Sequence, residues 1–475
     1  MQPKRCETGV RQMPAAVQYV DPNSKLRDTH LNVTISEERK KRKEEYDKSR
    51  KYYEGDQKHF LSKKAGEPDD NVIINVTRMA IDRTQTFLFP QMPALELAPA
   101  ETGATKEEKW VRAAWEFNGG VLFLQDCILN GSLSGHNYVR VLPLEKGELY
   151  PRLVNLDPTG VFTYWQADDI DTVLWHEVTW DVMEDEVNNV LTEYLQDIVH
   201  IKAEQRWEIH QYKRLSGTQW VEQEEFFQRW DFKFGPIIDW KHLPDPNRFY
   251  GKSETDHLPL QDKLNLVVSE NARINRYHSS PKTVGTGIKP GDIKDTGIDD
   301  FWSTENEKAQ IYNLEMKSNQ AFAQNLAEFM YDTYLAESRV VLLRGEVKDF
   351  QRVTNAGVRT VFMDMLSKNM ILRRLYAIGI QKITRAMGMV SGMGLEIIPD
   401  VIYPDPLPVD DAELVNINAI ERSMGVVSRE TISEKRGYIW TDELTRMEQE
   451  AELEIFAAPE ETEEPADSEP AQSDT

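Results

Sequence analysis

The stretch from Ser253 to Met387 constrains the fold most, because helical periodicity alternates there with segments that lack it. Apolar side chains at i, i+4, i+7 and i+8 predict a helix over 316–336. Its inner face would carry Phe322, Leu326, Phe329 and Met330. A second helix is predicted over 356–387, with Val358, Val361, Phe362, Met365, Leu366, Leu372, Leu375, Ile380 and Ile383 inside. The absence of a catalytic signature in this core favours an architectural function over chemistry.

The overall charge limits the partners that the chain can hold tightly. The formal net charge is −24 and the mean hydropathy is −0.57. An acidic surface repels nucleic acid at long range, so tight nonspecific binding to phosphates is disfavoured. Weak contact with DNA and contact with basic protein partners stay open.

Cysteine content and the length of apolar runs indicate the cellular compartment in which the chain folds. Cys6 and Cys127 are the only cysteines, which excludes a disulfide framework and fits a reducing cytosol. The opening MQPKRCETGV has no apolar signal region, and no apolar run approaches the roughly 18 residues of a membrane span. We therefore expect neither a secretion signal nor a membrane helix.

Local start signals predict three helices in the N-terminal part, after an aperiodic arm over residues 1–33. The capping box TISE at Thr34–Glu37 opens a charged helix to Tyr53, which we interpret as solvent-exposed because acids and bases interleave. Asn75 is expected to cap a short helix that stops before Pro90. A second capping box, TKEE, opens an apolar helix that continues past Gly119-Gly120 to Ile128.

Strand-like runs between residues 135 and 245 predict a β-rich subdomain attached to helices, and hence an α+β fold. Hairpins are expected to join 137–142 with 150–154 and 207–214 with 218–227, with further strands over 160–164 and 172–179. We also predict a helix over 182–200 from its apolar spacing.

The remainder of the chain is predicted to be mostly helical. A helical stretch opens at Gly251-Lys252-Ser253 and runs to Tyr277, and residues 280–315 are irregular with strands at 283–284 and 310–314. Small helices are expected between Asp410 and Ile455. The acidic, proline-rich tail 457–475 has the composition of a disordered segment.

Gly251-Lys252-Ser253 matches the end of a phosphate-binding loop, which would make the chain a nucleotide-dependent enzyme. Such a loop needs a glycine five residues before Gly251, where this sequence has Pro246, and a proline-rich approach replaces the required strand. An ordinary helix start with a cap is the favoured interpretation.

Other candidate chemistry is equally incomplete. Ser134 and His136 are near neighbours but have no third partner to orient them. The acids Asp168, Asp169 and Asp171 lack a calcium-loop pattern, so a solvated turn is favoured over a cation site. The scattered histidines form no metal motif. We expect no catalytic residue, no metal and no cofactor.

The segment 338–355 is a charged loop with a net charge of +2 in an acidic chain. It is either a plain solvent-exposed connection or a basic projection that touches a polyanion weakly. Its basic residues are Arg339, Arg344, Lys348 and Arg352.

The order of these elements resembles the portal proteins of tailed bacteriophages, over residues 70–455. The sequence FYGKSE at Phe249–Glu254 resembles the family's YGxSD/E entry into its first stem helix. Other matching segments are Asn155–Pro158 with Val161-Phe162, Leu264-Asn265, Ser269, Ser280–Lys282, Asn319–Ala336, Leu407–Asp410, Gly425–Thr431 and Asp442-Glu443. One departure is Asn355-Ala356-Gly357, where family members often have a Ser-Gly pair.

The resemblance implies the following division: an arm (1–33), a wing (34–252), a stem helix (253–280), a clip (281–315), a second stem helix (316–337), a channel loop (338–355), a long wing helix with a return strand (356–408), crown-like C-terminal helices (409–456) and the tail (457–475). It also implies that the loop's basic residues contact DNA in the channel. The clip would contact terminase through a region containing Lys282, Lys289, Lys294 and Trp302.

The resemblance further implies a non-enzymatic ring, typically a dodecamer, at one capsid vertex of the virion, assembled in the host cytoplasm. Expected partners are other copies of the chain, the terminase large subunit, a head-completion or adaptor protein, major capsid and scaffold proteins, and double-stranded DNA, with no membrane. A capsid assembly or scaffold factor without a channel is the main alternative.

Overall fold

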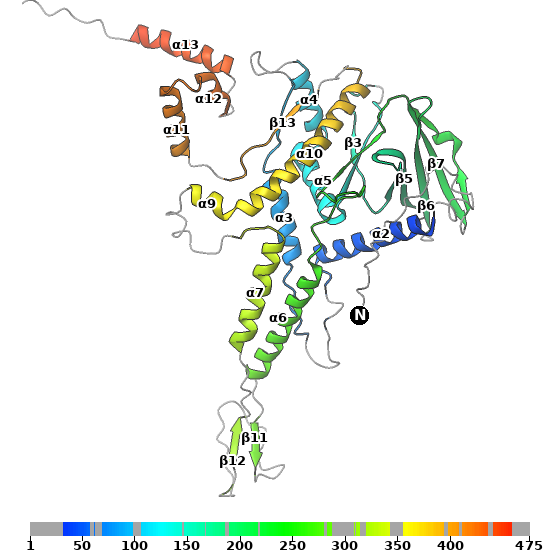
Figure 1. Cartoon of the computed structure of the whole chain (residues 1–475), viewed down its shortest axis with the longest axis vertical. Coiled ribbons are helices and arrows are strands. Elements are labelled where there is room, and N and C mark those ends of the chain that lie inside the picture. Colours follow the sequence, from blue (N-terminus) through cyan, green and yellow to red (C-terminus); the bar gives the residue numbers. More distant parts are fainter. Residues whose placement is uncertain are drawn as a thin grey trace, which may run out of the picture. The chain divides into compact units, whose positions relative to one another are not determined.

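An antiparallel pair of helices lies within the stretch from Ser253 to Met387. Helices α6 (Leu258–Ser279) and α7 (Gln320–Glu337) lie side by side (Figure 1). His257, just before α6, contacts Glu337 at the end of α7, with 3.0 Å between Nδ1 and Oε2. Both helices were predicted, but α6 begins at Leu258, five residues after Ser253, and in the interval the amide of Glu254 donates to the carbonyl oxygen of Ser132.

The residues predicted to lie on the inner face of α7 are only partly buried there. Met330 packs against a buried cluster that contains Leu264 of α6 and Tyr334 of α7. Phe322 and Phe329, however, are 67% and 68% exposed. Apolar residues at helical spacing indicate a helix face that packs against another element. They do not indicate whether that element belongs to the same chain or to another subunit.

The computed structural model describes residues 32–57, 61, 69–97, 106–144, 147–166, 168–185, 190–216, 219–279, 283–286, 308, 310–313, 320–342, 355–393, 398–407, 411–435 and 440–457. The chain separates into two compact units, which are described one at a time. The first contains residues 1–97 and 110–406, and the second contains 98–109 and 407–475. The predicted tail 457–475 and arm 1–33 lie almost entirely outside the described residues.

Two antiparallel sheets make up the predicted β-rich subdomain of the first unit. The larger sheet has the order β4-β5-β6-β7-β8, with β9 also paired to β7, and the smaller has the order β10-β2-β3. The strands are β2 (His136–Val141), β3 (Leu153–Asn155), β4 (Val161–Gln166), β5 (Asp169–Asp185), β6 (Val190–Ile201), β7 (Arg206–Ser216), β8 (Gln219–Glu222), β9 (Gln228–Trp230) and β10 (Ile237–Lys241), with a short 3-10 helix, η2 (Glu224–Phe226), before β9. Both predicted hairpins and the strand pair β4–β5 are confirmed.

The helix predicted over 182–200 is wrong. These residues form the end of β5 and most of β6, and Trp180 pairs with Tyr194 across the hairpin. Leu191, Leu195 and Ile198 have helical spacing, but Leu191 is 62% exposed and Ile198 is buried. Because β6 has a partner strand on each side, long-range pairing decided its structure over local periodicity.

Of the four N-terminal helices, only the two that follow Asn75 and Thr105 begin where the start signals predicted them; the first begins at Asn32, before the predicted box at Thr34, and the last follows a break. The four helices are α2 (Asn32–Glu54), α3 (Val76–Leu88), α4 (Lys106–Phe117) and α5 (Gly120–Ser134). Asn75 Oδ1 accepts a hydrogen bond of 2.9 Å from the amide of Arg78, which confirms the predicted cap of α3. The helix predicted to continue past Gly119-Gly120 is broken there into α4 and α5, since both glycines have positive φ.

Helix α2 is less solvated than its charge pattern suggested. Tyr46 and Tyr52 are buried on one side of the helix. Arg39 forms an ion pair with buried Glu177 of β5, and the guanidinium of Arg42 lies 3.3 Å from the ring centre of Tyr250. The interleaved charges on the outer face are exposed as predicted, but the inner face fastens α2 to the rest of the first unit.

The long helix predicted over 356–387 is interrupted once. It consists of α9 (Asn355–Val361) and α10 (Met363–Val390), with Phe362 at φ −87° and ψ 7° between them. Helix α10 packs against the smaller sheet, where Gly379 lies so close to the indole of Trp240 that a Cβ would stand 2.6 Å from Cδ2. Of the predicted inner residues, Met365, Leu372, Ile380 and Ile383 are buried, whereas Val361 is 53% exposed.

Two further strand pairs complete the first unit. β1 (Ala94–Glu96) pairs with β13 (Asp400–Ile402), and β11 (Thr283–Thr286) pairs with β12 (Gln310–Asn313), both antiparallel. The second pair follows α6 and precedes α7 in the chain, and it confirms the strands predicted there. Most residues between β11 and β12 lie outside the described part of the chain.

The second unit contains α11 (Asp411–Ser423), α12 (Arg429–Lys435) and α13 (Trp440–Ala457), which are the small helices predicted near the C-terminus. Ser428 caps α12, since its Oγ accepts a hydrogen bond of 3.1 Å from the amide of Thr431. Helix α11 ends at Gly425, whose φ of 70° is the left-handed conformation that glycine adopts easily.

Candidate functional site

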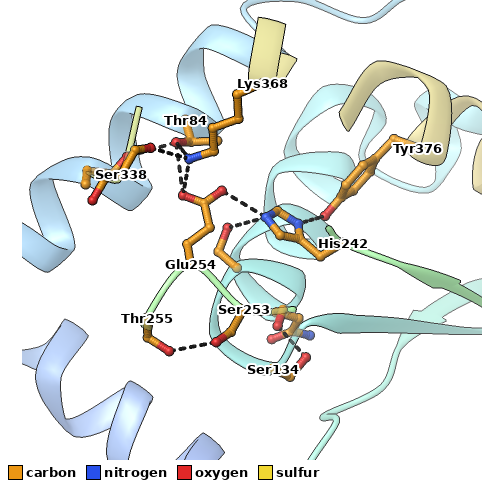
Figure 2. A network of polar contacts seen from close by, with 12 residues as sticks. Thr84, Ser134, His242, Ser253, Glu254, Thr255, Ser338, Lys368 and Tyr376 are labelled. Atoms are coloured by element: carbon orange, nitrogen blue, oxygen red, sulfur yellow. Dashed lines mark hydrogen bonds and ion pairs between the residues drawn. The ribbon is translucent and has the colours of Figure 1, made fainter. Parts of the chain in front are cut away.

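A buried lysine joins four elements at the base of the helix pair. Lys368 of α10 places its Nζ 2.7 Å from Glu254 Oε2, 3.1 Å from Thr84 Oγ1 of α3 and 3.1 Å from the carbonyl oxygen of Ser338 at the end of α7 (Figure 2). An ammonium group has three protons, so these three acceptors match its whole donor capacity. The segment predicted to carry the basic residues begins at Ser338.

The carboxylate of Glu254 extends the same network to His242 and Tyr376. Its Oε1 lies 2.9 Å from His242 Nε2, and His242 Nδ1 lies 2.8 Å from the hydroxyl of Tyr376 on α10. The amide of Glu254 also donates to the carbonyl oxygen of Ser132 in α5, at 2.8 Å. The acid of the FYGKSE motif is therefore fixed by both its side chain and its backbone.

The electrostatics of Glu254 follow from this geometry. Burial by itself raises the pKa of a carboxyl group, but the ammonium of Lys368 and the hydrogen bond with His242 outweigh it and lower the pKa of Glu254 to about 2. The carboxylate is ionised at neutral pH. A buried ion pair whose members are fully hydrogen-bonded is expensive to break, because either charge left alone is unsolvated.

Gly251 has a steric role that the phosphate-loop interpretation does not require. A Cβ at Gly251 would stand 2.5 Å from the carbonyl oxygens of Gly135 and Leu243, so the two backbones meet without room for a side chain. The amide of Lys252 donates to Leu243 O at 3.0 Å. Lys252 forms an isolated antiparallel bridge with Leu243, and the next helix starts only at Leu258, which differs from the predicted helix start and cap.

One face of α6 carries a ladder of amide and hydroxyl side chains that sequence reasoning did not identify as a unit. Gln261, Asn265 and Ser269 recur at i, i+4 and i+8 and are buried. They accept hydrogen bonds from the backbone amides of Val76, Ile74 and Val72, at 3.1, 3.0 and 3.0 Å.

The ladder explains why these polar residues lie on an inner helix face. Residues 72–75 lie beside α6 without regular secondary structure, and the backbone groups of Val72 and Ile74 have side chains of α6 as partners instead of a strand. The signal was present in the sequence as a polar residue every fourth position, but the chain segment that it binds lies far away in the sequence.

Of the residues predicted to contact DNA, the structure describes only Arg339. It is exposed and follows the end of α7, with a φ of 53°. The amides of Arg339 and Val340 donate to the carbonyl oxygens of Ala336 and Leu335, both at 3.0 Å, which is the Schellman ending of a helix. Arg344, Lys348 and Arg352 lie outside the described residues, as do the predicted clip residues Lys282, Lys289, Lys294 and Trp302.

The rejected catalytic and cation sites have ordinary structural partners. Ser134 Oγ lies 2.7 Å from the carbonyl oxygen of Asn130, while the imidazole of His136 faces Asp239, with 3.0 Å between Nε2 and Oδ2. Asp168 and Asp169 accept hydrogen bonds from Gln166 and Thr172 within their own turn. Within the described ranges, no cluster of His, Cys, Asp or Glu side chains is suited to a metal ion, and no helix has the length and apolar character to cross a membrane.

The comparisons with known proteins agree with the resemblance found in the sequence. No curated protein matches the chain significantly. The sequence profile described as "Phage portal protein, SPP1 Gp6-like" matches residues 33–455, which is nearly the whole chain. The chain therefore belongs to the SPP1 Gp6-like family of phage portal proteins.

Proposed function

We propose that copies of this chain form a closed ring at one capsid vertex, through which double-stranded DNA is packaged and ejected and on which terminase and head-completion proteins dock. Family membership gives the chain a phage portal role. The observation that best supports ring formation is the exposed aromatic face of α7, where Phe322 and Phe329 are 67% and 68% exposed in a single chain. Large apolar side chains in such a position stabilise a subunit interface.

A ring requires two different faces that meet head to tail. Helices α9 and α10 supply further exposed apolar residues in the same unit of the chain. These are Val361, Met363, Met370, Ile371 and Ile378. A chain of net charge −24 would also need polar and charged contacts in such an interface.

The charge distribution suits a conduit that does not hold its cargo. Many phosphate contacts make binding tight and dependent on salt, whereas an acidic body keeps DNA away from the walls. The basic residues of the loop, repeated by ring symmetry, would contact phosphates briefly. Arg339 is exposed at the start of that loop, and we extend the proposal to Arg344, Lys348 and Arg352 from the sequence.

The interface is tested by placing charges on the aromatic face of α7. Phe322→Glu combined with Phe329→Glu is expected to give a folded chain that sediments as a monomer, while the unmodified chain sediments as a large oligomer. Ala321→Glu combined with Gln324→Glu adds two charges to the same helix away from this face and should leave the oligomer intact. An oligomer that survives the aromatic substitutions excludes this face as the interface.

The clip assignment has its own experiment. We propose that residues 282–313, which include β11 and β12, contact terminase, with Lys282, Lys289, Lys294 and Trp302 in the contact region. Replacing this segment with a short glycine-serine linker should abolish terminase binding while the ring still forms. Unchanged terminase binding would reject the assignment.

A further inference from the structure

The chain ends α7 in a conformation that its sequence makes costly. Arg339 occupies the left-handed position of a Schellman ending, with a φ of 53°. Side chains with a Cβ are strained there, and glycine is the usual residue.

Two other helices of the same chain show the usual solution. Helix α10 ends with Gly392 at φ 69°, and the amide of Met393 donates to Gly388 O at 3.0 Å. Helix α11 ends with Gly425 at φ 70°, and the amide of Val426 donates to Glu421 O at 3.0 Å. The ending of α7 has the same hydrogen bonds without the glycine, so other contacts must hold it.

Two contacts hold the backbone on either side of Arg339. Val340 is buried against Leu335 and Tyr334, which fixes the residue after the turn. Lys368 donates to the carbonyl oxygen of Ser338, which fixes the residue before it. A cation at a helix C-terminus also interacts favourably with the helix dipole.

Lys368 can act on Ser338 only because its position is itself determined. Glu254 balances its charge, and Thr84 Oγ1 accepts a second hydrogen bond from its ammonium group. The side chain of Lys368 is 7% exposed, so water does not compete for the remaining donor. The ammonium is thus directed at the end of α7 by groups from two other parts of the fold, the segment before α6 and helix α3.

We propose that Lys368 is a positioning residue for the start of the segment 338–355: it caps α7 at Ser338 and so stabilises the strained turn at Arg339. Whether the conformation of this segment matters for contact with DNA rests on the proposed channel function. The cap itself is a property of the single chain.

The experiment measures hydrogen exchange of backbone amides over residues 338–342 in the full-length protein. Removing Lys368 alone would leave Glu254 buried without a counter-charge and would destabilise the whole unit. The informative variant is therefore Glu254→Gln combined with Lys368→Met, which removes both charges and keeps the side-chain sizes. Its melting temperature should stay within a few degrees of the unmodified protein.

In that variant the amides of residues 338–342 should exchange about fivefold faster, as expected for the loss of one hydrogen bond. Adding Arg339→Gly, which adopts the left-handed turn without strain, should restore slow exchange. Asn118→Ala removes partly buried hydrogen bonds elsewhere in the unit and should not speed exchange at residues 338–342 relative to the rest of the chain.

Two results would overturn the proposal. One is unchanged exchange at residues 338–342 in the charge-free variant, and the other is failure of Arg339→Gly to restore slow exchange. Neither result depends on DNA or on ring formation, so a failure here leaves the proposed portal function to be judged by its own experiments.

Discussion

Glu254 and Lys368 are 114 positions apart in the chain, and their charged atoms lie 2.7 Å from each other in the interior. The glutamate belongs to the motif that leads into α6, and the lysine belongs to α10. Because the same ammonium reaches the end of α7, this one ion pair joins both helices of the pair to the body of the first unit.

Removing one partner of this ion pair should be severely destabilising. Glu254→Ala leaves the ammonium of Lys368 buried without its counter-charge, and we expect a loss of about 3–5 kcal/mol in the free energy of unfolding. Urea denaturation at a fixed protein concentration measures it. Glu225→Ala, at an exposed position, serves as the control and should change stability by less than about 0.5 kcal/mol. Equal effects of the two substitutions would contradict the assigned role of Glu254.

Substitutions in Gly251-Lys252-Ser253 should separate a structural glycine from a phosphate-binding loop. Gly251→Ala pushes a Cβ against the carbonyl oxygens of Gly135 and Leu243 and should reduce the yield of folded protein strongly. Lys252→Ala, at an exposed position, should leave the melting temperature unchanged. ATP should bind neither the parent protein nor the variants in calorimetry. A Lys252-dependent ATP affinity would revive the nucleotide-site hypothesis.

Acidification should destabilise the β-rich subdomain through His176. Burial lowers the pKa of this histidine from 6.5 to about 4. As pH falls through 6.5, the unfolded chain takes up a proton that the folded chain does not, so stability decreases until about pH 4. The full difference corresponds to about 3 kcal/mol. His176→Gln should show a smaller decrease in unfolding free energy between these pH values; identical pH profiles would exclude this histidine as a cause.

The four basic residues of the loop should affect DNA and not assembly. These residues are Arg339, Arg344, Lys348 and Arg352. Replacing all four with alanine should impair packaging or retention of DNA while rings still form. The matched control replaces four lysines on the exposed side of α2 with alanine, namely Lys40, Lys41, Lys43 and Lys48, and should package normally. Normal packaging in the loop variant would remove the proposed contact.

Local signals in the sequence predicted local structure well. The cap at Asn75 depends on residues within one helical turn and is found, whereas the helix predicted to continue past Gly119-Gly120 is broken there. The buried face of α10 was also predictable, since Leu372, Ile380 and Ile383 follow one helical period. Errors arose where a distant partner decided the outcome, as in β6, whose pairing with β5 and β7 overrode a helical spacing.

The hydrogen-bonded network around Glu254 could be predicted only in part. FYGKSE was recognised as a motif, but nothing near Glu254 in the sequence indicates that Lys368, Thr84 and His242 surround it. The apolar spacing of α7 was read as a core face, although Phe322 and Phe329 are exposed in the single chain. Periodicity indicates that a helix face is apolar, but the element that packs against this face is determined by the tertiary structure and the assembly.

Ring formation is the central claim, and direct imaging of the purified full-length protein tests it. Negative-stain electron microscopy should show rings with an axial hole wide enough for double-stranded DNA. Particles without an axial hole, whether monomers or compact assemblies, would contradict the portal assembly and favour a capsid assembly factor without a channel.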